Sequence, residues 1–216
     1  MNLAAVRDAL QPHFLTVMGG FPAGADDDLP PGTRSLLLVG PQEPGFWPHV
    51  RSTAEFNDGN ADPLDRWSAR VLATVAESLG GTALFPFGGP PWHPFIAWAK
   101  RSGRAWSSPV GLLVHDEAGL FVSYRGALAL PQQVTLPAAP PCPCDSCTDQ
   151  PCRTACPVAA LTPQGYDVAA CRAFVTSPEG HGCMTNGCRV RRSCPVSAQY
   201  GRLPEQSAFH MRAFAR

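Results

Sequence analysis

The chain of 216 residues has no cysteine in its first 141 positions. All nine of its cysteines lie between Cys142 and Cys194, so thiol chemistry is confined to the C-terminal third. The chain also lacks an apolar run of membrane-spanning length, and we therefore expect no membrane insertion. Basic and acidic residues number 17 each, and this zero net charge gives no electrostatic case for binding DNA.

Two further absences bear on location and on nucleotide binding. The N-terminal segment MNLAAVRDALQPHF has Arg7 and Asp8 where an export signal would have its apolar stretch. We therefore expect a cytoplasmic protein with reduced thiols. The chain has neither a GxxxxGK[ST] nor a GxGxxG sequence, so no motif supports nucleotide binding.

The cysteines form two runs that each end in Cys-Pro, with spacings C-x2-C-x4-C-x3-C-P and C-x11-C-x4-C-x5-C-P. A cubane 4Fe–4S cluster takes one soft thiolate per iron. In two-cluster ferredoxins, the last cysteine of a run ligates the cluster of the other run. The pattern therefore predicts an iron–sulfur electron-transfer protein with two 4Fe–4S clusters, which would work with a redox partner protein.

The predicted ligand sets cross between the two runs. One cluster is assigned to Cys144, Cys147, Cys152 and Cys194, and the other to Cys156, Cys171, Cys183 and Cys188. Cys142 is the ninth thiol where eight suffice, and we interpret it as a non-ligand. No catalytic residue is predicted, so the pattern leaves open whether the chain is a carrier or a component of an oxidoreductase.

Other uses of cysteine fit the pattern less well. Structural zinc usually takes two matching C-x2-C pairs or adds histidines, whereas only Cys144 and Cys147 form such a pair and His181 is the one histidine in the segment. Disulfides need an oxidising compartment. A single cluster with a degraded second site remains an alternative, because both spacings are longer than the usual ones.

The fold class expected is α+β, with a mixed α/β domain at the N-terminus. The strongest sequence signals for a helix begin at Asp62 and Pro63. Apolar residues then recur three and four positions apart, and the pattern ends at Gly80-Gly81. Other helices are predicted at 3–12 and 95–101, and strands at 14–21, 34–40 and 82–85. Residues 111–115 and 120–130 predict a β-hairpin across DEAG.

Composition divides the chain into four parts. These are an α/β domain at 1–130 with possible cofactor binding, a proline-rich linker at 131–143, a two-cluster ferredoxin-like module at 144–198 and a tail at 199–216. The tail is expected to form a short helix that packs on the first domain. The run from Asp26 to Asp28 is interpreted as a solvated loop in preference to a metal site.

The order of these features resembles that of epoxyqueuosine reductase. The segment WAKRSGRAWSSPVGLLVHDEAGLFVSYRGALALPQQVTLP leads directly into the first cysteine run, and PPGTRSLLLVG is similar to that family's arginine followed by an apolar strand. YDVAACRAF, which carries Cys171, resembles the family's lone cysteine after a short helix. The resemblance implies cobalamin bound on residues 1–130, and it supplies the alternative function, a corrinoid-dependent reductase whose clusters feed electrons to cobalt.

The chain departs from that family at two points. It has no acidic residue from Leu84 to Arg101, where the resemblance places a catalytic aspartate. It also ends at Arg216, whereas the family continues into helical repeats that engage tRNA. The resemblance therefore implies a trimmed relative that lacks the catalytic acid, and tRNA is not expected as a partner.

Overall fold

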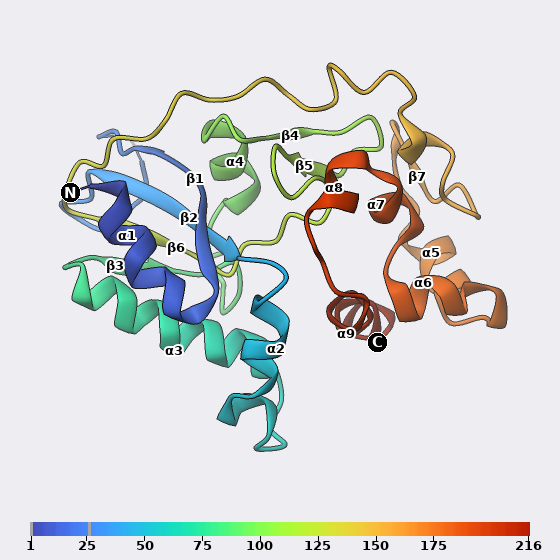
Figure 1. The fold of residues 1–216 in the computed structure, drawn as a ribbon, viewed down its shortest axis with the longest axis horizontal. Coiled ribbons are helices and arrows are strands. Elements are labelled where there is room, and N and C mark those ends of the chain that lie inside the picture. The colour runs from blue at the N-terminus through green and yellow to red at the C-terminus, as the bar shows by residue number, and fades with distance from the viewer. Residues whose placement is uncertain (1, 26) are drawn as a thin grey trace. The chain divides into compact units, whose positions relative to one another are not determined.

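The computed structural model describes residues 2–25 and 27–216 (Figure 1). Its strands are β1 (Leu15–Pro22), β2 (Ser35–Pro41), β3 (Thr82–Leu84), β4 (Ala105–Ser107), β5 (Leu113–His115), β6 (Gly126–Leu130), β7 (Leu161–Thr162) and β8 (Gly165–Tyr166). Its α-helices are α1 (Leu3–Leu10), α2 (Phe46–Arg51), α3 (Pro63–Ser78), α4 (Phe95–Arg101), α5 (Val168–Val175), α6 (His181–Asn186), α7 (Arg189–Ser193), α8 (Pro195–Gln199) and α9 (Pro204–Ala215). Single 3-10 turns are η1 (Gln11–His13), η2 (Ala54–Phe56), η3 (Pro151–Arg153) and η4 (Pro178–Gly180). The predicted mixture of α and β structure is confirmed.

The chain divides into two compact units. Unit 1 contains Met1–Arg104 and Ser123–Ala139, and unit 2 contains Ala105–Val122 and Pro140–Arg216. These boundaries differ from the predicted ones, because a segment of the expected first domain belongs with the cysteines. Most of the predicted linker belongs to unit 1.

Unit 1 is built on a four-stranded antiparallel sheet in the order β1-β2-β6-β3. Every residue of β2 is buried, and Leu36, Leu37, Leu38 and Val39 have no exposed surface at all. A short, continuously apolar segment bounded by turn residues favours such a central strand, because both of its faces are covered. The strand predicted at 34–40 is thus confirmed.

Helix α3 packs against β3 and β6 and supplies buried side chains such as Trp67 and Leu72 to the core of unit 1. It begins at Pro63 as predicted. Asp62, however, makes no capping hydrogen bond with its side chain and has a left-handed backbone with φ 50°. Proline, with its fixed φ, therefore starts this helix without a side-chain cap.

The hairpin predicted across residues 116–119 is reduced to a single antiparallel bridge between His115 and Gly119, and the predicted pairing of the two strands is wrong. Strand β5 pairs with β4 in unit 2, whereas β6 lies between β2 and β3 in the sheet of unit 1. The physical reason is burial: all five residues of β6 are buried, and in unit 1 this strand has hydrogen-bonded neighbours at both edges while α3 packs against it.

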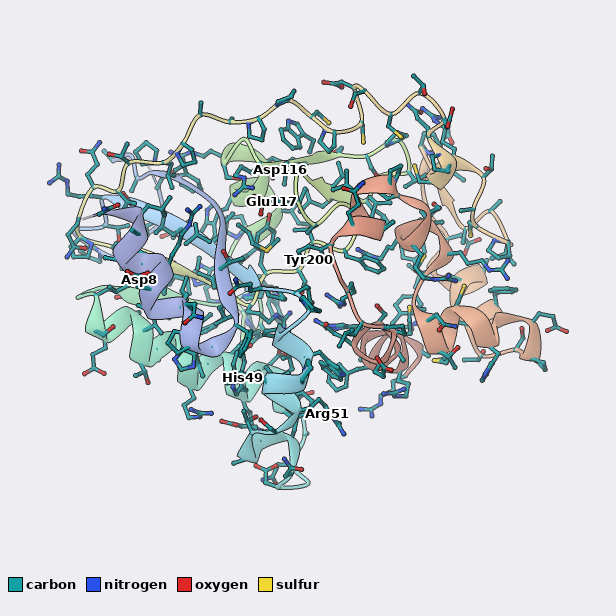
Figure 2. The ribbon with its side chains drawn as sticks, viewed as in Figure 1. Asp8, His49, Arg51, Asp116, Glu117 and Tyr200 are labelled. Atoms are coloured by element: carbon teal, nitrogen blue, oxygen red, sulfur yellow. The ribbon has the colours of Figure 1, made fainter. Side chains whose placement is uncertain are left out.

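A local turn replaces that hairpin. The Nδ1 atom of His115 accepts hydrogen bonds from the amide N–H groups of Glu117 (3.1 Å) and Ala118 (3.3 Å). Figure 2 labels Asp116 and Glu117 in this turn. Gly119 follows with φ +56°, and a Cβ atom there would lie 2.5 Å from the backbone nitrogen of Ser197. This close approach to Ser197 leaves room for glycine alone at position 119.

The C-terminal tail forms α9, which packs against α6 and α5 within unit 2. The expected helix is thus present, and its main contacts lie within unit 2. Its buried face carries Gln206, Ser207 and Ala208, and the Cβ atom of Ser207 lies 2.6 Å from the position that a Cβ atom on Gly187 would take. Small residues at this contact let the helix approach the chain that carries the cysteines.

The acidic run before β2 is only partly described. Asp26 lies outside the described residues. Asp27 forms an ion pair with Arg101 of α4, and its carboxylate accepts the amide N–H of Gly24 (2.6 Å). The hydrogen bond from Arg101 lowers the pKa of Asp27, so this side chain ties a loop to a helix in unit 1. Separately, none of the described helices has the length and apolar character needed to cross a membrane.

Candidate metal centres

One cavity of unit 2, with a volume of about 390 Å³, is lined by four cysteines. Cys144 and Cys147 lie on the loop before η3, where the amide N–H of Cys147 donates to the carbonyl of Cys144 (3.3 Å). Cys152 lies within η3 and is buried. The fourth, Cys194, comes from the second run and occupies the N-cap position of α8, without a capping hydrogen bond from its side chain. We call these four the first set.

A second cavity is lined by the other four cysteines of the predicted sites. Cys156 follows η3, Cys171 lies in α5, Cys183 lies in α6 and Cys188 occupies the N-cap position of α7. We call these the second set. This cavity is narrow, at about 20 Å³, and its other walls are mainly apolar: Pro157, Val158, Leu161, Phe174, Val175, Arg189, Val190 and Met211.

The two sets coincide with the two predicted ligand sets, including the exchange of the last cysteine between the runs. Both exchanged residues precede a proline. Pro195 is the first residue of α8, so Cys194 lies where that helix begins. After Pro157 the chain turns back, and the Sγ atom of Cys156 accepts the amide N–H of Ala160 (3.2 Å).

Electrostatics links the thiols within the first set. Burial raises the pKa of the Cys144 thiol, and the charges of Cys142, Cys152 and Cys194 raise it further. Burial likewise raises the pKa of Cys152, followed by the charges of Cys194 and Cys147. These thiols are therefore protonated at neutral pH unless a cation binds them, and metal loading would release protons.

The second set shows the same pattern with one difference. Burial raises the pKa of the Cys171 thiol, and the charges of Cys188, Cys156 and Cys183 raise it further. A hydrogen bond from the Tyr166 hydroxyl acts in the opposite direction and favours the thiolate. The second set thus has a side-chain donor directed at one of its sulfur atoms.

A buried hydroxyl at the first cavity bears on whether the residues there fit an iron–sulfur cluster, because such a donor needs an acceptor. Ser108 lines this cavity, and its Oγ atom has no hydrogen-bond partner within the described part of the chain. A buried hydroxyl without a partner is costly. A cluster would offer sulfur acceptors in this cavity, so the donor set and the unpaired hydroxyl both fit that group.

The thiols of neither set converge on one point in the part of the chain that the structure describes. Among residues 2–25 and 27–216, no group of three or more histidine, cysteine, aspartate or glutamate side chains is placed to hold one metal ion. Zinc needs its ligands about 2.0–2.3 Å from one point. In a cube each cysteine binds a different iron, so the thiols are spread around the cluster. A cube in the narrow second cavity requires outward movement of flexible walls such as Met211.

Two other candidate residues lie apart from the cavities. Cys142 lines neither cavity, although its side chain hydrogen-bonds with Cys144. His181 is exposed at the start of α6 and also lines neither cavity. In unit 1, the ring of His93 stacks on Trp98 with 5.4 Å between centroids, which is a packing role.

Sequence reasoning missed three polar side chains near the thiols: Ser108, Tyr166 and Arg189. Ser108 and Tyr166 carry no motif, and only the fold places them there. Arg189 had a usable signal, because it follows Cys188 directly in the sequence.

A comparison of the chain with known protein families, with curated proteins and with solved structures finds no match in any of the three. The resemblance to epoxyqueuosine reductase therefore stays a prediction from the sequence. The same holds for cobalamin binding, which the resemblance alone implies.

Proposed function

We propose that the protein is an iron–sulfur electron carrier that holds two 4Fe–4S clusters in unit 2. One observation carries the proposal: each of two cavities is lined by four cysteines, and each set combines three thiols of one run with one thiol of the other. Four soft thiolates spread around a cavity are the ligand set of such a cluster.

The chain's own groups have distinct tasks in this function. When bound, each cluster would accept and release an electron. The thiolates hold it, while the Ser108 hydroxyl and the Ala160 amide N–H supply hydrogen bonds at the first and second sites, respectively. The apolar walls of the second cavity limit the access of water, and such access is one of the factors that set a reduction potential.

Metal analysis is the direct test. Protein prepared without oxygen, or reconstituted with iron and sulfide, is expected to contain about eight irons and about eight sulfides per chain. Iron and sulfide assays measure this, and the absorption spectrum should be broad and brown. About four irons would instead favour a single cluster, and stoichiometric zinc in a colourless protein would refute the proposal.

Epoxyqueuosine reduction is expected to be absent. A general acid must lie within hydrogen-bond reach of its substrate, and residues 84–101 contain no aspartate or glutamate where the resemblance places that acid. The assay is turnover of epoxyqueuosine in tRNA by reconstituted protein with added cobalamin. Measurable turnover, together with a spectral shift of cob(II)alamin on titration, would favour the corrinoid-dependent reductase over the carrier.

A further inference from the structure

The turn between β4 and β5 forms part of the wall of the first cavity, although it lies outside both cysteine runs. Ser108 and Pro109 line this cavity, and β5 adds Val114. The amide N–H of Gly111 donates to the carbonyl of Ser108 (3.0 Å), and the amide N–H of Ser108 donates to the carbonyl of Leu112 (2.8 Å). Proline in the second place and glycine in the fourth are typical of such turns. Both backbone polar groups of Ser108 are thus paired, and its place at the cavity is fixed.

The same turn packs against cysteines of the first set. Val110 belongs to a buried hydrophobic cluster that also contains Cys152, and Cys144 and Cys194 pack against that cluster. These contacts involve apolar side chains and sulfur atoms. The turn is therefore held beside the thiols by packing in which the hydroxyl of Ser108 takes no part.

Three hydroxyl side chains line the first cavity, and they differ in their partners. Ser146 donates to the carbonyl of Pro143 (3.4 Å), and Thr148 donates to the carboxylate of Asp149 (3.4 Å). Ser108 is only 7% exposed, and in the part of the chain that the structure describes its Oγ atom has no hydrogen-bond partner. A donor buried in this way needs an acceptor in the space that it borders. At this cavity, sulfur atoms would be that acceptor.

We infer that Ser108 is the hydrogen-bond donor that sets the reduction potential of the first cluster, an inference that rests on the proposed function. Its hydroxyl donates to a sulfur atom of that cluster, and the negative charge on the acceptor strengthens the bond. Each added electron makes a cube held by four thiolates more negative, so the bond stabilises the reduced form more than the oxidised form. Ser108 therefore raises the potential.

The effect belongs to one cluster. Ser108 lines the first cavity and not the second, whose walls contain no serine or threonine among the described residues. Because Ser108 lies outside both cysteine runs, it separates the potentials of the two clusters without any difference in their ligands.

The test is a redox titration of the full chain, loaded with iron and sulfide, with dithionite as reductant and paramagnetic resonance as the readout. Ser108→Ala removes the hydroxyl and keeps the backbone bonds of the turn, whereas Ser108→Thr keeps a hydroxyl. The matched control is Ser146→Ala, because Ser146 lines the same cavity but already has an acceptor within the chain. The midpoint of the first cluster is the one that disappears in Cys194→Ser.

Ser108→Ala is expected to shift the midpoint of the first cluster to a more negative potential and to leave the other midpoint unchanged. Ser108→Thr and Ser146→Ala should stay near the wild type. Pulsed paramagnetic resonance after exchange into D2O gives a second readout, because it detects exchangeable protons next to the reduced cluster. Ser108→Ala should lose one such coupling that the wild type shows. Loss of the first cluster from Ser108→Ala, with Ser108→Thr fully loaded, would also support the hydrogen bond.

Other outcomes overturn the inference. They are a fully loaded Ser108→Ala protein with unchanged midpoints, an equal shift of both midpoints, or the same shift in Ser146→Ala. An equal shift or equal cluster loss in Ser108→Thr would mean that position 108 matters only for packing of the turn. A wild-type protein that holds no cluster would refute the proposed function itself, which separates the two failures.

Discussion

Cys194→Ser is expected to remove the cluster whose other three ligands come from the first run. Cys194 lines the first cavity with Cys144, Cys147 and Cys152, although 42 positions separate it from Cys152. Serine is a poor ligand for iron because its hydroxyl is harder and less acidic than a thiol. The variant should therefore lose about four of about eight irons per chain.

Cys156→Ser is the reciprocal variant. It should remove the other cluster, because Cys156 lines the second cavity with three cysteines of the second run. Iron counts combined with paramagnetic resonance of the reduced proteins distinguish the two losses. Uncrossed ligation predicts the opposite assignment, with each variant losing the cluster of its own run.

Cys142→Ser is the matched control for both variants. Cys142 is a half-buried thiol of the same segment but lines neither cavity, so its replacement should leave the iron content unchanged. If Cys142→Ser loses a cluster while Cys171→Ser keeps both, the assignment is wrong. The first site would then start at Cys142.

Local sequence signals predicted the elements of unit 1 well but not how they pair. The apolar run at β2 and the proline at the start of α3 are local features, and both elements formed where expected. The partner of β6 is not a local feature, because it depends on which distant strands offer an edge and on which elements cover the sheet. The DEAG sequence predicted that the strand before it would pair with the strand after it. In the structure, β6 pairs instead with β2 and β3.

Cysteine spacing was sufficient to predict which thiols line each candidate site, but not which other side chains surround them. The grouping of Cys194 with the first run followed from the ligation pattern of two-cluster ferredoxins. The unpaired hydroxyl of Ser108 and the hydrogen bond of Tyr166 depend on segments folded back from elsewhere in the chain. No spacing rule contains that information.

One hydrophobic cluster of unit 2 involves five of the proposed ligands. It consists of Val110, Val114, Leu120, Cys152, Leu161 and Val190, against which Trp106, Leu112, Ala155, Cys144, Cys156, Cys188 and Cys194 pack. Helices α6, α7 and α8 have only 6, 5 and 5 residues. Isolated helices shorter than about 12 residues are marginal in water. The proposed ligands are thus also a large part of this core.

Removal of the clusters is therefore expected to unfold unit 2 while unit 1 stays folded. Metal binding energy is folding energy in modules of this kind. Hydrogen exchange after treatment with an iron chelator and an oxidant should show loss of amide protection throughout Pro140–Arg216. The sheet β1-β2-β6-β3 and α3 should keep theirs, since they belong to unit 1, which contains no cysteine.

The segment Ala105–Val122 makes this experiment specific. It belongs to unit 2, and the amide N–H of Leu120 donates to Ser197 Oγ (2.8 Å) at the start of α8. Strands β4 and β5 should therefore lose protection together with the cysteine module. Protection that persists in β4 and β5 would place them with unit 1, and protection that persists in α6 to α9 would show that the module folds without metal. Loss of protection in β2 would mean that the two units unfold as one.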